Sequence, residues 1–412
     1  MCSTVWSLRS LGDLVEVLDH LRVPINSDER AKRLGDVPYY GANGQQGWID
    51  KALFNESLIL LTEDGGNFDE FRSRPIAYRI NGPAWVNNHA HIVRALFGVD
   101  QDFVFWSVVN RDIRRYIAGG TRSKLTQGEL RTIELMTPPL PEQRRIAEIL
   151  DTLDAAIRQT EAVIAKLSQV KQGLLHDLLT RGIDGNGELR RPVEEARELY
   201  RETELGWVPR EWGVERLADL AEVRSGIAKN SNKAVSNPVW VHYLRVANVQ
   251  DGYLDLTEMS QIRVSHDDVE RYVVLPGDVL MNEGGDLDKL GRGAVWRGQF
   301  TPCVHQNHVF VVRCGHRLLS DYLDSWTGSA PARRYFMVAG KQTTNLASIN
   351  KTALGRLPVA VPGLREQAGI VEALALQQEQ VDREQELFGK LRTLKQGLMD
   401  DLLTGNVRVD LR

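Results

Sequence analysis

The chain has 412 residues, of which 42% are hydrophobic and 26% charged, and its formal net charge is −4. A chain of this length is too long to fold around one ordinary hydrophobic core, so we expect at least two globular domains. No apolar run approaches the ~18 residues of a membrane-spanning helix, and the N-terminus lacks the pattern of a signal peptide, so we expect no membrane association.

Two further features of the composition limit the function without fixing it. The cysteines Cys2, Cys303 and Cys314 have no metal-type spacing and suit a reducing cytoplasm, the compartment that we expect for this chain. The small negative charge does not exclude a nucleic-acid partner, because binding depends on local basic patches.

Residues 1–137 are rich in short Val, Ile and aromatic runs separated by Gly, Asn and Asp. The runs SLILLT (57–62), PIAYRI (75–80) and AHIVRAL (90–96) predict strands. The stretches LGDLVEVL (11–18) and DFVFWSVV (102–109) are interpreted as helices. We therefore expect an α+β domain built on a small sheet.

A long helix is predicted after this domain, over residues 142–180. Pro141 suits its first turn, and Glu142 complements the positive end of the helix dipole. Residues alternate by steps of four and three as in a coiled coil, with Thr160 and Lys171 as the polar positions. The apolar seam consists of Ile146, Leu150, Leu153, Ile157, Ile164, Leu167, Leu174 and Leu178.

The second half of the chain follows the same plan. Residues 183–205 form a charged, partly helical linker, residues 206–361 a second domain with a strand at NHVFVVR (307–313), and residues 362–412 a second long helix. Arg365 replaces the proline, and Gln377, Glu384 and Lys395 interrupt the second seam. That seam consists of Ile370, Leu374, Val381, Phe388, Leu391, Leu398 and Leu402.

The two halves are an internal duplication. KQGLLHDLLT (171–180) and KQGLMDDLLT (395–404) share eight of ten residues, and the match extends without a gap back to Pro138 at an offset of 224. The globular parts correspond more weakly, as in WSLRSLGDLVEV (6–17) against WGVERLADLAEV (212–223), at offsets near 206. Two matching seams in one chain can pair with each other, and an antiparallel pair creates a pseudo-two-fold axis.

We therefore expect an α+β chain with two pseudo-symmetric globular domains separated by two long antiparallel coiled-coil helices. The segments are residues 1–137, 138–182 (central helix), 183–205 (linker), 206–361 and 362–412 (distal helix).

The sequence offers little catalytic chemistry. It has no phosphate-binding glycine loop between a strand and a helix, and the cysteines form no zinc set. NNHAH (87–91) has two histidines without an adjacent carboxylate, so we interpret it as polar surface and predict neither a metal site nor catalytic residues.

Polar and basic loops in corresponding places of both halves favour DNA. Amide and arginine side chains bond base edges, and basic clusters bond phosphates. The base-readout candidates are Tyr39, Tyr40, Asn43, Gln45, Gln46, Asn88, His89, Arg245, Asn248, Gln250, Asn307 and His308. The phosphate candidates are Arg114, Arg115, Arg122, Lys124, Lys289, Arg292, Arg297, Arg333, Arg334 and Lys341.

With these motifs the chain resembles a specificity (S) subunit of a type I DNA restriction-modification system. LPEQRRIAEILDTLDAAI with KQGLLHDLLT is similar to the family's central conserved region, and LREQAGIVEAL with KQGLMDDLLT to its distal one. TELGWVPREW (203–212) resembles the entry to a second recognition domain, and VPYYGANGQQGWID (37–50) a recognition-domain opening.

The resemblance implies that this chain selects the DNA site and that other subunits act on it. Each target recognition domain reads half of an asymmetric, interrupted site in double-stranded DNA, and the helices set the spacer. Two modification (methyltransferase) subunits dock on the helices and bring S-adenosylmethionine to adenine, which is flipped out of the duplex. Restriction (translocase/nuclease) subunits add ATP- and Mg-dependent cleavage. The chain itself binds no cofactor and works in a prokaryotic cytoplasm, associated with the nucleoid.

Two other hypotheses stay open at this point. A stand-alone DNA-modifying enzyme needs a cofactor or metal site in this chain. A coiled-coil tether needs no affinity for DNA.

Overall fold

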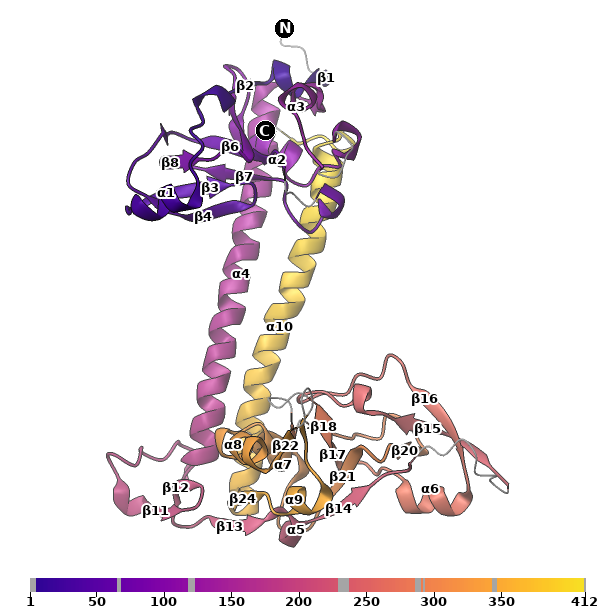
Figure 1. Ribbon diagram of the computed structural model, residues 1–412. Coiled ribbons are helices and arrows are strands. Elements are labelled where there is room, and N and C mark those ends of the chain that lie inside the picture. Colours follow the sequence, from indigo (N-terminus) through magenta and orange to yellow (C-terminus); the bar gives the residue numbers. More distant parts are fainter. Residues whose placement is uncertain are drawn as a thin grey trace. The chain divides into compact units, whose positions relative to one another are not determined.

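The computed structural model describes residues 5–64, 68–117, 123–228, 237–285, 290–291, 293–342 and 347–410 (Figure 1). The chain forms two compact units, the first made of Met1–Ala162 with Gln385–Arg412 and the second of Val163–Glu384. Each unit contains one globular domain and a stretch of both long helices, α4 (Leu140–Thr180) and α10 (Leu364–Leu402).

Two four-stranded sheets form the domain of the first unit. One is antiparallel, with the strand order β2 (Val15–Val17), β9 (Ala90–Ala95), β6 (Leu58–Thr62) and β7 (Ala77–Ile80). The other has the order β4 (Gly44–Ile49), β3 (Val37–Gly41), β8 (Pro83–Val86) and β5 (Phe54–Asn55), and β3 and β8 are parallel. A separate pair joins β1 (Ser7–Ser10) to β10 (Glu134–Thr137).

Short helices connect these strands. They are η1 (Leu11–Asp13), η2 (Asp19–Leu21), α1 (Ser27–Lys32), η3 (Phe68–Glu70), α2 (Gln101–Val109), η4 (Arg114–Tyr116) and α3 (Gln127–Thr132). The helix α2 packs against β6, β7 and β9 of the antiparallel sheet. The Asp100 side chain caps α2 by accepting from the Phe103 amide at 2.9 Å. Buried Phe103, Val104 and Trp106 of α2 then join one hydrophobic core with the first turns of α4.

The domain of the second unit repeats this arrangement. Its antiparallel sheet has the order β14 (Ala221–Ser225), β21 (Val309–Cys314), β17 (Val279–Asn282) and β19 (Gly293–Val295). Its second sheet has the order β16 (Ser260–Val264), β15 (Val239–Leu244) and β20 (Cys303–His305), and β15 and β20 are parallel like β3 and β8.

Smaller elements complete the second unit. The strands are β11 (Tyr200–Thr203) paired with β12 (Gly206–Pro209), β13 (Gly213–Arg216) paired with β24 (Pro358–Val361), and the set β18 (Gly284–Gly285), β23 (Ala347–Ser348) and β22 (Lys341–Gln342). The helices are η5 (Arg197–Leu199), α5 (Leu217–Leu220), η6 (Val246–Asn248), α6 (His266–Tyr272), α7 (Ser320–Thr327), α8 (Ala330–Ala339) and α9 (Lys351–Gly355).

The long helices run antiparallel within each unit. In the first, Asp154 of α4 accepts from Lys395 of α10 at 2.5 Å, and the start of α4 meets the segment that follows α10. In the second, Lys171 donates to Gln378, and the start of α10 meets the segment that follows α4. The chain is therefore an α+β protein with two pseudo-symmetric domains and two long antiparallel helices.

The predicted seam faces inward along both helices. Ile146, Leu150, Ile370 and Leu402 are almost fully buried, and Thr160 is buried at 8% exposure despite its hydroxyl. The helix α10 passes through Gln377 and Glu384 without a break. The Gln377 amide nitrogen is buried without a hydrogen-bond partner, which makes this seam position unfavourable for stability.

Strand and helix predictions were confirmed except at two places, and the predicted distal helix of residues 362–412 is helical only over Leu364–Leu402. SLILLT, PIAYRI, AHIVRAL and NHVFVVR contain β6, β7, β9 and β21, and DFVFWSVV lies in α2. LGDLVEVL is not a helix but η1 followed by β2, because buried Val15 and Val17 alternate with exposed Glu16. The predicted linker carries only a short 3₁₀ helix, η5, and then contributes β11 to the second unit. Among the described residues, no helix is long and apolar enough to cross a membrane.

Candidate nucleic-acid interface

Three loops of the first unit meet at one end of its two sheets. The Asn87 amide donates to the Tyr40 carbonyl at 3.0 Å, and the Glu63 amide donates to the His89 carbonyl at 3.0 Å. The Thr62 hydroxyl adds a bond to the Ala42 carbonyl at 2.8 Å. These bonds join the β3–β4 turn, the end of β6 and the β8–β9 turn into a single surface, which we call the first loop end.

Most first-domain candidates for base contact lie on this surface. Asn43, Gln45, Gln46, Asn88 and His89 are exposed there. The Gln45 amide is held lightly, by a bond of 3.3 Å to the Gly47 carbonyl. Tyr40 is half-buried, with its ring centroid 6.0 Å from that of Tyr78. The roles of these side chains in base contact stay predictions.

The structure corrects two of the base-readout candidates. Tyr39 is 2% exposed and packs with Ile49 and Trp85, so its ring belongs to the core and cannot reach a base edge. Asn248 is 3% exposed, and its amide bonds the Asp255 and Glu258 carbonyls at 2.9 and 3.2 Å. With a third bond, from the Arg245 amide, its side chain closes the β15–β16 loop from inside. These three bonds to the backbone leave little hydrogen-bonding capacity for a ligand.

The second unit has the equivalent surface, which we call the second loop end. The Gln306 amide donates to the Leu244 carbonyl and the Glu283 amide to the His308 carbonyl, both at 2.9 Å. The backbone therefore has the bonding pattern of the first loop end. His308 is exposed here, while Arg245, Gln250 and Asn307 are partly exposed.

An ionic cluster lies beneath the first loop end. His91 Nδ1 is 2.6 Å from an Asp19 oxygen, and Arg22 donates to Glu63 at 2.5 Å. Burial acts to raise the pKa of Asp19, but the hydrogen bond and charge of His91 outweigh it and the pKa lies below its ordinary value. Burial likewise acts to raise the pKa of Glu63, but its hydrogen bonds to Arg22 and Lys124 help to outweigh that effect, and the pKa is lowered. Both carboxylates are thus held in the charged form.

Asp19, Glu63 and His91 lie close enough together to be considered as metal ligands. However, the second ring nitrogen of His91 is 2.8 Å from the Leu125 carbonyl, and the first faces Asp19. Nε2 therefore faces a backbone carbonyl instead of a metal position, and Nδ1 faces a carboxylate that Arg22 also pairs with. Arg22 already supplies a positive charge to both acids, so we interpret the cluster as an ion-paired support of the loop end.

Many of the phosphate candidates are engaged in ion pairs. Arg114 pairs with Asp112 at 2.6 Å, Arg115 with Glu134 at 3.0 Å and Lys124 with Glu63 at 2.9 Å. In the second unit the pairs are Arg297 with Asp321 and Arg333 with Asp251. Arg334 and Lys341 are exposed. A phosphate contact by a paired residue requires an exchange of partners, which solvent exposure allows.

Three of these candidates fall outside the part of the chain that the structure describes. They are Arg122, Lys289 and Arg292.

Sequence reasoning missed a clamp at the start of each long helix. The carboxylate of Glu142, which is 2% exposed, accepts from the Trp6 indole at 3.1 Å and from Arg408 at 2.6 and 2.7 Å. One side chain thus joins the first domain, the start of α4 and the segment after α10.

Glu366 makes the same clamp in the second unit. It accepts from the Trp212 indole at 3.1 Å and from both terminal nitrogens of Arg190, which lies after α4. Burial opposes the charge of Arg190, but the bond to Glu366 wins and the pKa of Arg190 is raised. The retention of Glu-Gln and of Trp in both halves was the signal available in the sequence.

The glutamine that follows each clamp glutamate has its own role. The side-chain oxygen of Gln143 accepts from the Asp100 amide at 2.9 Å, and its nitrogen donates to the Pro138 carbonyl at 2.8 Å. Gln367 repeats both contacts with the Leu319 amide at 2.8 Å and the Pro362 carbonyl at 2.9 Å. Each glutamine therefore fixes the N-terminus of α2 or α7 to the start of a long helix.

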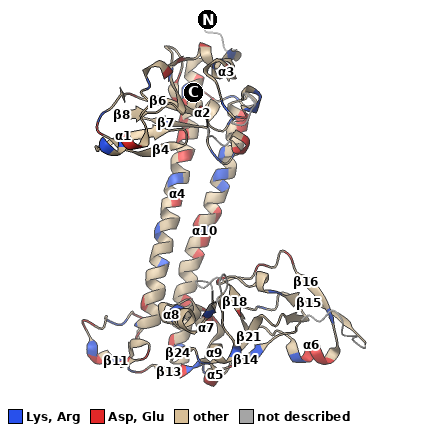
Figure 2. Ribbon diagram, in the orientation of Figure 1, with Lys and Arg blue, Asp and Glu red and all other residues tan. Residues whose placement is uncertain are grey.

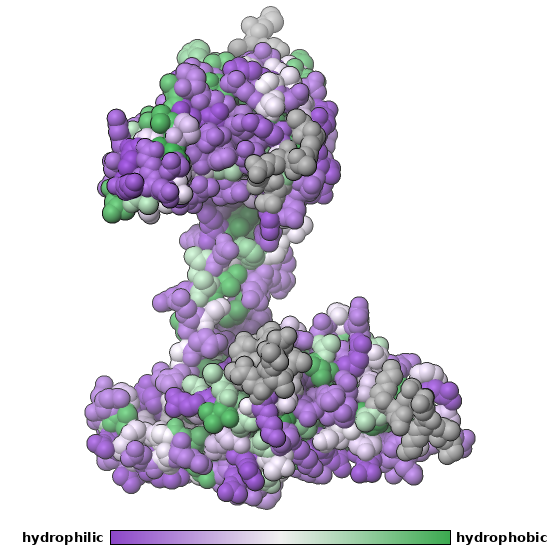
Figure 3. All heavy atoms as spheres, in the orientation of Figure 1, coloured by the Kyte–Doolittle hydropathy of each residue, from purple (hydrophilic) through white to green (hydrophobic). Residues whose placement is uncertain are grey.

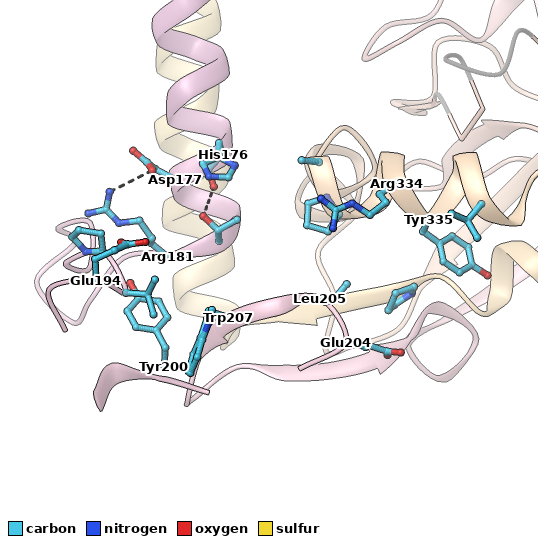
Figure 4. A pocket seen from close by; sticks show the side chains of 17 residues that line it. His176, Asp177, Arg181, Glu194, Tyr200, Glu204, Leu205, Trp207, Arg334 and Tyr335 are labelled. Atoms are coloured by element: carbon cyan, nitrogen blue, oxygen red, sulfur yellow. Dashed lines mark hydrogen bonds and ion pairs between the residues drawn. The ribbon is translucent and has the colours of Figure 1, made fainter. Parts of the chain in front are cut away.

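The repeated decapeptide has two structural roles. Its lysines, Lys171 and Lys395, reach the facing long helix, and Lys395 also lies 4.7 Å from the Trp106 ring centroid. Its last turns line a cavity in each unit. The cavity of the second unit has a volume of about 650 Å³ (Figure 4).

Figure 4 shows this cavity between the end of α4 and the helix α8. His176 and Asp177 of α4 and the following Arg181 lie on one side, and Arg334 and Tyr335 of α8 on the other. The corresponding cavity of the first unit, about 240 Å³, is lined by Asp400 and Thr404 of the second decapeptide and by the end of α2.

The outer surfaces of the long helices are mixed. Lys and Arg alternate with Asp and Glu along both helices (Figure 2). Apolar side chains lie among them (Figure 3). In the first unit Ile149, Leu394 and Leu398 line an open apolar groove of about 380 Å³, in which Leu394 is 51% exposed. The equivalent positions in the second unit hold Ala373, Val170 and Leu174, beside Leu376, which is 55% exposed.

Comparison with known proteins shows which family the chain resembles. Residues 4–169 match the family model of the type I restriction modification DNA specificity domain. A putative type I restriction enzyme specificity subunit of Haemophilus influenzae is 24% identical over 368 residues, which cover 89% of this chain and 86% of that protein.

The chain is similar to the type I restriction-modification specificity subunits. Another such subunit, MjaVIII of Methanocaldococcus jannaschii, is 21% identical and aligns over 98% of this chain and 93% of its own length. The type I restriction enzyme EcoKI specificity subunit of Escherichia coli is 24% identical over 269 residues, 64% of this chain and 55% of its own length.

Solved structures from type I restriction-modification systems share the fold. The S subunit of a type I restriction-modification system from M. genitalium superposes with a TM-score of 0.59 at 12% identity, covering 98% of this chain and 97% of that one. A chain from a structural study of complex assembly in the type I R-M system gives a TM-score of 0.54 at 16% identity, with 98% of both chains covered.

Proposed function

We propose that each globular domain of this specificity subunit reads one half of an asymmetric, two-part site in double-stranded DNA. The observation that carries the proposal is the pair of loop ends, in which one backbone pattern presents different polar side chains. Asn43, Gln45 and Gln46 stand in the first, and Gln250 and Asn307 in the second. Amide side chains of this kind discriminate base edges in the major groove.

The two long helices set the spacer between the half-sites in this proposal. An insertion of four residues after Thr160 lengthens α4 by ~6 Å, at ~1.5 Å per residue, and is the milder interruption of a heptad seam. DNA advances ~3.4 Å per base pair, so the variant is expected to select a spacer one or two base pairs longer with both half-sites unchanged. An unchanged spacer at full activity refutes the spacer role.

The helices also dock two modification subunits, one on the apolar groove of the first unit and one on the equivalent helix surface of the second. Leu394 lines that groove, and Leu376 lies on the helix surface of the second unit. Leu394→Asp and Leu376→Asp, singly, are each expected to remove one modification subunit from the complex, and the double variant both. Leu34→Asp, at an 86% exposed position in the first domain, is the matched control. Mass measurement of the assembled complex decides the stoichiometry.

The chain contributes site selection and no catalysis of its own. S-adenosylmethionine is held by the modification subunits, and ATP and Mg by the restriction subunits. Adenine methylation and DNA cleavage follow in those subunits, in the cytoplasm where the DNA lies.

A domain exchange tests the assignment of half-sites. Residues 1–137 are replaced by the equivalent domain of another specificity subunit, and methylated adenines are mapped in cells that carry the complete system. We expect one half-site to change and the other to stay. A change in both halves refutes the modular assignment. Methylation without added modification subunits indicates a stand-alone enzyme, and a complex that lacks salt-sensitive DNA binding indicates a tether.

A further inference from the structure

Each loop end carries an exposed histidine held by a carboxylate. His89 Nδ1 is 2.7 Å from an Asp64 oxygen, and His308 Nδ1 is 2.5 Å from a Glu283 oxygen. The histidine side chains are 50% and 55% exposed, and the acids 31% and 29%. The same pair therefore stands at the same place on both surfaces.

The two pairs are not a simple remnant of duplication, because the acids occupy different positions. The amides of Glu63 and Glu283 both donate to the carbonyl of the paired histidine, so Glu63 is the counterpart of Glu283. Yet Glu63 turns inward to Arg22 and Lys124, and its neighbour Asp64 takes the histidine. The first domain thus rebuilds the pair from the next residue along the chain.

The carboxylate fixes which ring nitrogen carries the proton. A charged carboxylate only accepts, so Nδ1 carries the hydrogen in both pairs. In the neutral form of the ring, the other nitrogen, Nε2, is then an acceptor. In the second domain this assignment agrees with the Asn307 amide nitrogen, which lies 3.3 Å from His308 Nε2.

A phosphate contact is a poor explanation for such pairs. An acid within 3 Å of the ring cancels or reverses its charge and repels the DNA backbone. A base edge is the better partner, because an acceptor of fixed position discriminates the exocyclic amino groups of adenine and cytosine from the oxygens of guanine and thymine. Lys124, whose backbone pairs with Asp64, supplies a positive charge beside the first pair.

We propose that Asp64 and Glu283 are positioning residues for base recognition. Asp64 orients Nε2 of His89, and Glu283 orients Nε2 of His308 with the Asn307 amide beside it, so that each histidine is a determinant of one base pair in its half-site. The inference rests on the proposed function and names a determinant within it. The ligand is a base-edge amino group in the major groove.

The decisive variants are Asp64→Asn and Glu283→Gln, which preserve size but supply an amide donor. An amide N–H directed at Nδ1 favours the reverse tautomer, in which Nε2–H becomes a donor. The expected result is a changed preference at one base pair of one half-site, by about tenfold, rather than a uniform loss. Asp64→Glu, which still only accepts, is expected to retain the wild-type preference.

The measurement uses the complete methyltransferase complex on DNA libraries with each position of the site randomised. His89→Gln is the second variant and must alter the same base pair as Asp64→Asn. Glu56→Gln, which breaks an exposed pair with Arg94 in the same domain, is the control and must change nothing. Uniform weakening, unchanged preference or an effect in both half-sites overturns the inference. If the wild-type complex selects no two-part site, it is the proposed function that fails.

Discussion

The two loop ends have the same backbone and different foundations. Beneath the first lies the ionic cluster, with His91 at 1% exposure in the second position of β9. The same position of β21 holds Phe310, which is 2% exposed in an apolar core. Where Thr62 ends β6, Asn282 ends β17 and its amide bonds the Val249 carbonyl at 2.8 Å.

This difference shows which parts of the fold are interchangeable. The backbone bonds at the loop ends and the glutamate clamps recur in both units, while the side chains beneath the loops do not. An ionic support and an apolar support therefore present the same loop geometry. Side chains at the loop ends can consequently diverge without loss of the fold.

The largest expected effect is a loss of unfolding free energy when the glutamate of a clamp is removed. Glu366→Ala leaves Arg190, whose side chain is 9% exposed, without its carboxylate, and is expected to cost about 4 kcal/mol of unfolding free energy. Glu142→Ala is expected to cost less, because the Arg408 side chain is 49% exposed and regains water. Denaturant unfolding of both variants measures the difference, and equal losses contradict the role that we give to the burial of Arg190.

A second comparison concerns a carboxyl group of the second unit alone. Burial, with the charges of Asp321 and Asp251, raises the pKa of Asp324 to about 7. Above that pH the folded chain holds a buried charge, and this cost disappears as pH falls toward the unfolded value of 3.8. Asp324→Asn is therefore expected to stabilise the protein by about 4 kcal/mol at pH 8 and little at pH 4. A pH-independent gain in denaturant unfolding is the contrary result.

A third prediction uses His305, whose counterpart at the end of β8 is Val86. Burial lowers the pKa of His305 to about 4, while Nδ1 donates to the Val309 carbonyl at 2.6 Å. The unfolded chain takes up the proton first, so stability from the neutral ring is lost as pH falls from 6.5 toward 4.

His305→Val loses the hydrogen bond, which makes it less stable than wild type at pH 7. Its deficit is expected to shrink by about 2 kcal/mol at pH 5, because only the wild-type ring must be protonated on unfolding. Asp324 titrates alike in both proteins and cancels in the comparison. A deficit that is equal at the two pH values rules out the buried neutral histidine.

The smallest effects concern DNA contacts. Arg114→Ala with Arg115→Ala is expected to weaken binding to all sequences and to reduce the salt slope by about one unit for each lost phosphate contact. Asn43→Ala is expected to relax one base preference by about 1–3 kcal/mol. Binding isotherms at several salt concentrations separate the two, and a base-specific effect of the arginine changes shows that the roles are reversed.

The sequence was most informative where structure is periodic and local. Steps of three and four residues placed α4 and α10, and the internal match established the duplication before any coordinates. Short β-branched runs predicted β6, β9 and β21, because strand preference is also a local property of the sequence. In LGDLVEVL the period-two burial of Val15 and Val17 competes with helical spacing. The strand that these residues form, β2, pairs with β9, which lies far away in the sequence.

The site was less predictable because its contacts are long-range. Trp6 and Glu142 are 136 residues apart, and Arg408 and Glu142 are 266 apart. Tyr39 and Asn248 are of residue types suited to DNA contact, but only the folded chain shows that they face inward. The His–carboxylate pairs could be sought from the two Asn-His motifs, although the change of acid from Glu283 to Asp64 hides their likeness.

The unequal continuity of the two units has a consequence for synthesis. The second unit, Val163–Glu384, is one uninterrupted segment, whereas the first needs Gln385–Arg412 to join Met1–Ala162. On the ribosome the first domain emerges early, but the α10 residues that cover its part of the seam, and Arg408 of its clamp, emerge last. We therefore expect the N-terminal unit to be the later one to mature. A released chain that is truncated after residue 384 should yield a protease-resistant second unit beside a first unit that is still cleaved.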